Sequence, residues 1–91
     1  MAKGRYEPYL DQESGLRFDF KCEPTQPSLL HIFARHGTSP QDAISTFFEG
    51  ETNWNETRKR FETFTETHGL YWVWRVQDTV VLVISCFRMD E

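Results

Sequence analysis

The last third of the chain, residues 58–89, is the stretch that most constrains its fold. It contains three runs rich in β-branched and aromatic residues, separated by the short polar breaks His68-Gly69 and Gln77-Asp78. Val, Ile, Thr and Trp lose side-chain freedom on a helix and fit the pleated surface of a sheet. The pattern therefore predicts an antiparallel meander of three strands, over residues 58–66, 70–76 and 79–88.

The register of this meander follows from its second break. A two-residue turn at Gln77-Asp78 fixes which side chains lie opposite each other. Gln-Asp is a poor primed turn, so a longer loop with a shifted pairing is the alternative. Both faces of the predicted sheet are apolar, so other parts of the chain must cover both faces, or one face is left to bind a partner. The expected pairs are Trp74 with Val81, Trp72 with Val83 and Leu70 with Ser85 on one face, and Val73 with Leu82 and Tyr71 with Ile84 on the other.

The N-terminal part of the chain predicts an arm followed by a strand. Residues 1–14 are polar and of mixed charge, which indicates a loose or partly docked arm. Residues 16–22 alternate apolar and charged side chains, as a half-buried strand does. A break with two prolines follows at residues 23–27. The inward face of the strand is expected to carry Leu16, Phe18, Phe20 and Cys22.

The next segment predicts two helices. Ser28 can cap a first helix over residues 29–36, with Leu29, Ile32 and Phe33 as its apolar stripe and Gly37 after its end. The second helix has Ser39 as its N-cap, Pro40 at its first position and Gly50 as its stop. Its expected apolar stripe is Ala43, Ile44, Phe47 and Phe48, and residues 51–56 are expected to form a polar loop that Trp54 pins to the core.

The order of these elements predicts an α+β fold, with two helices packed on an antiparallel sheet in the order β-α-α-β-β-β. With 91 residues the chain is expected to form a single small domain. Its net charge of −4 does not favour nucleic-acid binding through bulk charge, although a local basic patch is compatible with it. No run of about eighteen apolar residues and no apolar leader is present, so we expect a cytoplasmic protein without a membrane span. The two cysteines lack metal-ligand spacing and are expected as reduced thiols, with no metal and no cofactor.

One cluster with chemical potential is the segment 31–37. On a helix, His31 and Arg35 share a face, and His36 lies at the helix end. These side chains can supply a general acid or base together with an arginine that binds phosphate. The alternative is a solvated helix face with a histidine that helps to satisfy the last carbonyls.

Two further clusters lie on the predicted meander. Alternation sends Arg58 and Arg60 to one face and Lys59 to the other, and a guanidinium fork fits a phosphate bidentately. The alternative is a charged strand start that neighbouring glutamates neutralise. The third cluster consists of Ser85, Phe87 and Arg88 at the end of the last strand, with Arg75 on the neighbouring strand. The alternatives are that Ser85 is a packed hydroxyl and that Arg75 and Arg88 are charges that keep a sheet edge soluble.

Two stretches carry a family resemblance. The segment HIFARHGTSPQDAISTFF, residues 31–48, is similar to the KHG-(hydrophobic)-S-x-x-E-A-x-x-x-F stretch of BrnT-like toxins. The ending VISCFRMDE, residues 83–91, resembles their closing I-I-S-x-R strand. The opening HIFARHG before a strand meander also resembles the barnase, EndoU, colicin and RelE group of small ribonucleases. The likeness covers residues 28–91, and it departs from the family in an acidic chain and a compact meander.

The resemblance implies a toxin-type ribonuclease that cleaves RNA without a metal ion and is neutralised by a partner antitoxin. It matches His36 to the helix-end histidine of the family, Arg35 to a basic position, and Ser85 and Arg88 to the final strand. In such chemistry a base activates the ribose 2′-hydroxyl and arginines stabilise the charge that develops on phosphorus. The expected catalytic residues are His36, Arg58, Arg60, Ser85 and Arg88, and the expected substrate-binding residues are His31, Arg35, Lys59 and Arg75.

The competing expectation is a non-catalytic protein-interaction module, such as an inhibitor encoded by a phage or mobile element, or a degenerate toxin fold. The acidic charge favours it, and so does an aromatic sheet face at Tyr71, Trp72 and Trp74, because Trp and Tyr are common interface anchors. The RNA target, the identity of a protein partner and the oligomeric state are left open by the sequence. Convergence of the arginines and His36 on one cleft discriminates between the two expectations.

Overall fold

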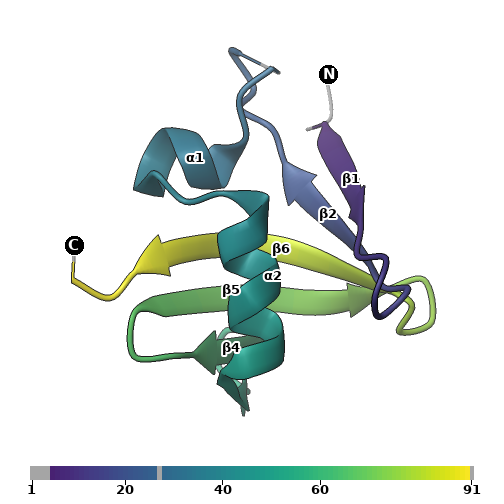
Figure 1. Cartoon of the computed structure of the whole chain (residues 1–91), viewed down its shortest axis with the longest axis vertical. Coiled ribbons are helices and arrows are strands. Elements are labelled where there is room, and N and C mark those ends of the chain that lie inside the picture. Colours follow the sequence, from purple (N-terminus) through teal and green to yellow (C-terminus); the bar gives the residue numbers. More distant parts are fainter. Residues whose placement is uncertain (1–4, 27, 91) are drawn as a thin grey trace.

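The computed structural model describes residues 5–26 and 28–90 as an α+β fold with two helices and one six-stranded mixed sheet (Figure 1). Residues 1–4 of the expected arm, Pro27 of the expected break and Glu91 of the C-terminal motif lie outside the described residues. The strands are β1 (Tyr6–Leu10), β2 (Arg17–Lys21), β3 (Glu51–Asn55), β4 (Arg60–Phe64), β5 (His68–Arg75) and β6 (Val80–Arg88), and the helices are α1 (His31–His36) and α2 (Pro40–Glu49).

The strands follow the order β1-β2-β6-β5-β4-β3 across the sheet. Neighbouring strands are antiparallel except β2 and β6, which run parallel. The expectation of an antiparallel sheet is therefore correct for the meander and wrong for this central pair. The chain between β2 and β6 passes through both helices and three strands, and a pair joined by such a long connection is free to run parallel.

The meander of β4, β5 and β6 forms as expected, and its register agrees near the second turn. Trp74 lies opposite Val81 and Trp72 opposite Val83. A register shift between Tyr71 and Trp72 then leaves one extra residue on β6, so Tyr71 lies opposite Ser85 rather than Ile84. The connection itself spans residues 76–79 rather than two residues, with positive φ at three of its positions, as expected from a poor primed turn.

Two strands lie where the sequence predicted a loop and an arm. Residues 51–55 form β3 at one edge of the sheet, and the ring of Trp54 packs against Phe61 at a centroid distance of 4.8 Å. Residues 6–10 form β1 at the other edge, with Tyr9 packed edge-on against Phe20. Both strands are polar or contain proline, which edge strands tolerate, so neither shows the apolar signature of a central strand.

Helix α2 begins as predicted, with Ser39 as N-cap and Pro40 in its first turn. The cap is stronger than the sequence suggested. Asp42 accepts a hydrogen bond from the Ser39 backbone N–H at 2.9 Å, and the Ser39 hydroxyl accepts one from the Asp42 N–H at 3.1 Å. Asp42 therefore completes the reciprocal capping box that usually requires Glu or Gln.

Replacing Ser39 with alanine should cost about 1 kcal/mol of unfolding free energy, because one N–H of the first turn loses its acceptor. Urea denaturation of the two proteins measures this difference. Ser45→Ala, in the middle of α2, is the matched control and should change stability by less than about 0.5 kcal/mol. Equal losses from the two substitutions would contradict the role of the cap.

Helix α1 is shorter than predicted. It begins at His31 rather than after Ser28, because Leu30 pairs with Cys22 in an isolated antiparallel bridge. It ends at Gly37 as expected, in the left-handed conformation with φ of 68°. Ile32 is buried, whereas Phe33 is 55% exposed, so the expected apolar stripe is only partly correct.

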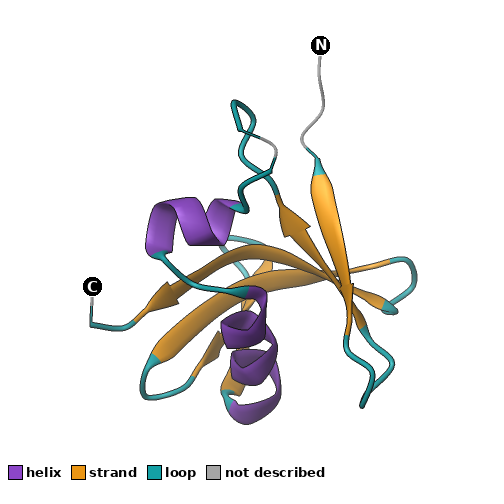
Figure 2. Ribbon diagram, turned by 45° about the horizontal axis from the view of Figure 1, so that its top comes forward, coloured by secondary structure: helices purple, strands orange, loops and turns teal. Residues whose placement is uncertain are grey.

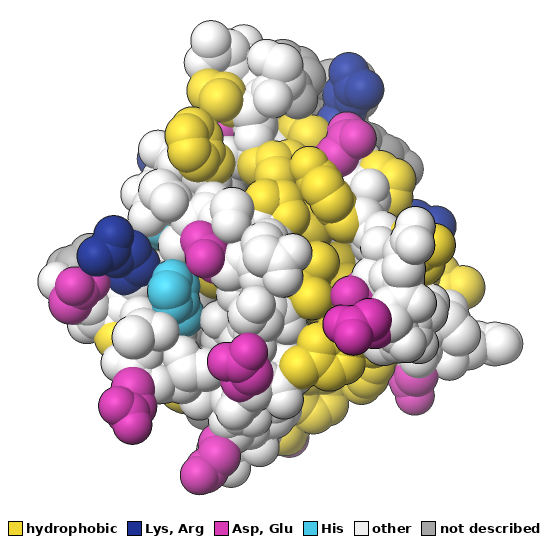
Figure 3. Space-filling view, in the orientation of Figure 1, with side chains coloured by type: hydrophobic (Ala, Val, Ile, Leu, Met, Phe, Trp, Pro, Cys, Tyr) yellow, Lys and Arg dark blue, Asp and Glu magenta, His cyan; other side chains and the backbone are white. Residues whose placement is uncertain are grey.

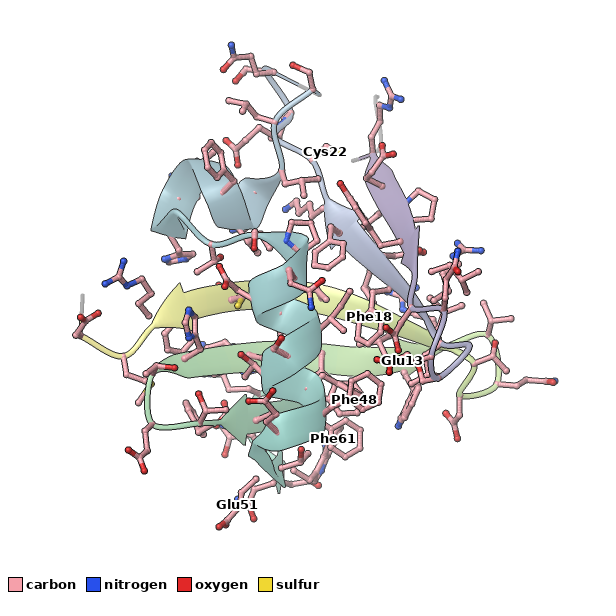
Figure 4. All side chains as sticks on the ribbon, viewed as in Figure 1. Glu13, Phe18, Cys22, Phe48, Glu51 and Phe61 are labelled. Atoms are coloured by element: carbon pink, nitrogen blue, oxygen red, sulfur yellow. The ribbon has the colours of Figure 1, made fainter. Side chains whose placement is uncertain are left out.

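The two helices leave one face of the sheet uncovered. Helix α2 crosses β6, β5 and β4, and α1 lies where β2 and β6 separate (Figures 1 and 2). The side chains of Phe18, Trp72 and Val83 form the core beneath α2. Phe18, Phe48 and Phe61 lie along one side of this helix in Figure 4. In the part of the chain that is described, no helix crosses the opposite face, which we call the open face.

This arrangement corrects the expected interaction surface. Trp72 is only 4% exposed, and Trp74 packs against the core on the same side of the sheet. The face formed by Trp72 and Trp74 is therefore the core beneath α2. Tyr71 points to the open face, because successive side chains of a strand alternate.

Candidate functional site

A carboxylate and an imidazole form the centre of the site. Oε2 of Glu23 lies 3.0 Å from Nδ1 of His31 and 3.6 Å from Nε of Arg35. The side chains of Glu23 and His31 are 13% and 25% exposed. The hydrogen bond from His31, with the positive charge of Arg35, lowers the pKa of Glu23 from its ordinary value. A histidine that donates from Nδ1 to a carboxylate keeps Nε2 as the atom that accepts a proton.

The turn before α1 brings Glu23 to His31. Cys22 pairs with Leu30, and the Glu23 N–H donates to the Leu29 carbonyl at 2.9 Å. Residues 22 and 23 therefore lie beside residues 30 and 29, and Glu23 meets His31, which is eight positions away. No sequence pattern predicts this contact, because neither helical nor strand spacing connects positions 23 and 31.

His31 borders a hollow on the open face. The parallel pairing of β2 with β6 ends at Phe20 and Val83, and the two strands then separate. The hollow has a volume of about 280 Å³ and includes the polar side chains of Tyr6 and Lys21. It is lined by Tyr6, Lys21, His31, Leu82, Val83 and Ile84. Lys21 and Tyr6 therefore line the same hollow as His31.

A second imidazole lies near the first. The ring centroids of His31 and His36 are 6.3 Å apart, and the ring of His36 lies 6.1 Å from that of Phe87. His36 is the last residue of α1 and precedes Gly37, whose left-handed conformation ends the helix. In-line displacement at phosphorus places the attacking and leaving oxygens on opposite sides, so a base and an acid must be separated by about the width of a phosphate. The two histidines have such a separation.

Two more of the predicted residues lie on the open face. The guanidinium carbon of Arg60 sits 3.6 Å from the ring centroid of Tyr71, and Nε of Arg60 lies 2.9 Å from Oε2 of Glu62. Ser85 is the cross-strand partner of Tyr71 and points to the same side of the sheet. Arg60 and Ser85 therefore lie on either side of Tyr71 on the open face.

The remaining predicted residues do not join this group. Arg58 and Lys59 lie in the turn between β3 and β4, where Lys59 forms an ion pair with Glu56. Arg75 is exposed at the end of β5 that faces away from α1. Arg88 lies on the side of the sheet that α2 covers, 3.4 Å from Asp90 and beside His68. The arginines therefore do not share one cleft with His36, and by this criterion the protein-interaction module is favoured over an active site built from arginines.

Three residues of the site are not predicted from the sequence, namely Tyr6, Lys21 and Glu23. Tyr6 lies in the segment predicted as an arm, and Lys21 is predicted only as a charged residue of a half-buried strand. Its alternation with Phe20 was a usable signal, because it places the ammonium on the face opposite the core.

Metal and thiol chemistry have no visible centre in this structure. In residues 5–26 and 28–90, no group of three or more His, Cys, Asp or Glu side chains is placed to hold a metal ion. Cys22 and Cys86 are buried free thiols, and burial raises the pKa of Cys86 to about 11, which disfavours a reactive thiolate. The two helices of the described chain are both too short to cross a membrane.

Replacing Glu23 with glutamine should remove a pH-dependent contribution to stability. Folding lowers the pKa of Glu23, so its ionised form stabilises the protein above the pKa of the unfolded chain, and this stabilisation disappears as the pH falls through the folded pKa. The melting temperature of the native protein should exceed that of the variant at neutral pH, and the difference should shrink towards zero as the pH falls through the folded pKa of Glu23. A difference that is constant with pH would contradict the ion pair.

Comparison of the chain with protein-family models, with curated proteins and with solved structures finds no match.

Proposed function

We propose that this protein is a toxin-type ribonuclease that cleaves RNA without a metal ion. One observation carries the proposal: Glu23 orients His31 beside an open hollow, and His36 lies close by. A carboxylate-oriented imidazole with a second imidazole at 6.3 Å can supply both the base and the acid for phosphodiester cleavage.

In the proposed reaction, Nε2 of His31 removes the proton of a ribose 2′-hydroxyl. The 2′-oxygen forms a bond to the adjacent phosphorus, and the bond from phosphorus to the 5′-oxygen of the next nucleotide breaks. His36 in its protonated form donates a proton to that leaving oxygen. The products are a 2′,3′-cyclic phosphate and a 5′-hydroxyl, so the attack uses no external nucleophile.

Lys21 is the cation placed to stabilise the charge on phosphorus, because it lines the same hollow as His31. Glu23 is a positioning residue, and Arg35 balances its charge at 3.6 Å. Arg60 and Ser85 lie beside Tyr71 on the open face, where we assign them to substrate binding. Arg58, Arg75 and Arg88 have no part in the proposed reaction.

The test is incubation of the purified protein with a mixed-sequence RNA in EDTA. Cleavage with 2′,3′-cyclic phosphate ends is the expected result, and RNA that stays intact at micromolar protein would overturn the proposal. The deoxy analogue of the same strand is the control, since it has no 2′-hydroxyl and should remain uncut.

A partner antitoxin belongs to the same proposal. The partner would have to cover the open face beside His31 and His36, where half-buried aromatic side chains offer interface anchors. Co-expression with a genetically adjacent small protein should then restore growth to cells in which this chain is toxic, and a lack of toxicity on its own would argue against the pair.

A second candidate function is a non-catalytic protein-interaction module. Two observations favour it: the predicted arginines do not converge on one cleft with His36, and basic side chains pair with carboxylates, which reduces their availability to phosphate. Arg17, Arg35, Lys59, Arg60 and Arg88 each form such a pair. This candidate predicts that RNA stays intact in the cleavage test.

A further inference from the structure

We propose that the open face of the sheet is a stacking surface for single-stranded RNA, which leads the strand towards His36 and His31. The inference rests on the proposed ribonuclease function and deepens it, because it names the substrate as an unpaired strand rather than a duplex.

Three aromatic rings from adjacent strands form this surface. The centroids of Tyr71 and Phe87 are 5.0 Å apart, those of Phe64 and Tyr71 are 6.3 Å apart, and those of Phe64 and Phe87 are 6.5 Å apart. All three side chains are of intermediate exposure. Phe87 also lies 6.1 Å from His36, so the aromatic surface continues to that imidazole.

Gly69 lets the ring of Phe87 lie on the backbone of the neighbouring strand. The two residues are cross-strand partners, and a Cβ added at position 69 would lie 2.5 Å from the Phe87 ring and 3.0 Å from the Phe64 ring. Such an approach excludes any side chain at this position. The Phe87 ring is therefore held against Gly69 of the neighbouring strand, and it stays partly exposed on the open face.

Arg60 adds a cationic plane to the aromatic surface. Its guanidinium carbon is 3.6 Å from the ring centroid of Tyr71, and Glu62 holds its Nε at 2.9 Å. Glu62 in turn accepts a hydrogen bond from the Asn55 side chain at 2.9 Å. A guanidinium fixed in this way can stack on a base and contact a phosphate, as arginine does in many single-strand sites.

The charge of the open face differs from that of the whole chain. By strand register, the face carries four basic side chains and three acidic ones, a net charge of +1, whereas the chain carries −4. The acidic excess lies elsewhere, and Figure 3 shows acidic side chains spread over the side that bears the helices. The charged residues of the open face are Arg17, Lys21, Arg60 and Arg75, with Asp19, Glu51 and Glu62.

The chemistry of this surface favours an unpaired strand. In a duplex the bases are stacked on each other and their flat faces are closed, whereas a single strand can place each base against an aromatic ring. Base stacking tolerates any sequence, because every base has such a face. A modest positive charge is sufficient where the stacking supplies much of the affinity.

The test uses a fluorescent RNA of about ten nucleotides whose 2′-hydroxyls are all methylated, so that it cannot be cleaved. Fluorescence anisotropy measures its affinity for the full-length protein, alone and annealed to its complement. We expect the single strand to bind at least about tenfold more tightly than the duplex.

Phe87→Leu and Tyr71→Leu should each weaken binding of the single strand by about tenfold. Phe48→Leu is the matched control, because Phe48 is 49% exposed on α2, and it should leave the affinity unchanged.

Each outcome decides between the claims. Equal affinity for strand and duplex, or no effect of either open-face substitution in folded protein, overturns the inference. Absence of binding to both RNAs overturns it too and favours a protein as the occupant of the face. Binding of the single strand by a protein that leaves ordinary RNA intact would retain this inference and remove the ribonuclease proposal. Cleavage that is insensitive to Phe87→Leu and Tyr71→Leu, with unchanged binding, would retain the ribonuclease proposal and remove this inference.

Discussion

Replacing His31 with alanine is expected to lower the rate of RNA cleavage by about 100-fold to 10,000-fold, the range for loss of a general base. The reason is geometric. His31 has its Nδ1 fixed by Glu23 at 3.0 Å and lines the hollow in which a phosphate can lie. Cleavage of a short RNA under single-turnover conditions, in EDTA, measures the effect without a contribution from product release.

His68 provides the matched control for this substitution. It lies on the side of the sheet that α2 covers, in a hollow with Thr67 and Arg88, and its Nδ1 is 2.9 Å from the Thr67 hydroxyl. His68→Ala should leave the rate of cleavage unchanged. If His68→Ala lowers the rate as much as His31→Ala, or if neither substitution has an effect, the assignment of the base is wrong.

The pH dependence of cleavage separates the two imidazoles. A base is active in its neutral form and an acid in its protonated form, so a pair of them gives a bell-shaped profile. His36→Ala should remove one limb of the profile, while Glu23→Gln should lower the rate and keep both limbs. A purely structural role for His36 would lower the rate without changing the shape of the profile.

The meander could be predicted because the local preferences of its residues are sufficient to determine its strands. Trp74 and Val81 pair as expected, since β-branched and aromatic residues around a short polar break leave few alternatives. The register shift beyond Tyr71 could not be predicted in this way. A bulge adds one residue to one strand only, and no residue type in that part of β6 requires it.

The edge strands and the parallel pair depend on contacts between distant parts of the chain. Tyr9 belongs to a strand because its ring packs against Phe20, and the sequence around it is polar and contains Pro8. The pairing of β2 with β6 is fixed by the core beneath α2, where Phe18 and Val81 are both fully buried. Local patterns do not contain this information.

The part of the site that lies within one short segment of the chain could be predicted from local patterns. The segment 31–36 stood out because two histidines and an arginine lie on one short helix, and the structure places all three near Glu23 or each other. The basic residues of the meander were harder to place. Alternation predicted a shared face for Arg58 and Arg60, but Arg58 lies in the turn before β4 and Arg60 alone lies beside Tyr71. The side of the sheet on which Arg88 lies depends on the bulge that precedes it.

Replacing Trp72 with alanine should lower the free energy of unfolding by about 3–5 kcal/mol, the usual cost of removing a buried aromatic side chain. Trp72 is 4% exposed and stacks on Phe61 at 4.6 Å, and the edge of its ring packs against Phe47 at 4.8 Å. Its indole N–H also donates to the buried Thr63 hydroxyl at 2.9 Å. The loss would be a large part of the stability of a domain of this size, about 5–15 kcal/mol.

Trp54→Ala is the control, because Trp54 is 47% exposed on the edge strand β3 and packs against the same Phe61 ring. It should cost less than about 1.5 kcal/mol. Urea denaturation followed by far-ultraviolet circular dichroism compares the variants without relying on tryptophan fluorescence, which both substitutions alter. Trp72→Phe should fall between the two, since it keeps most of the contact area but leaves the Thr63 hydroxyl without its indole donor. Equal losses for Trp54→Ala and Trp72→Ala would show that Trp72 is not the central side chain beneath α2.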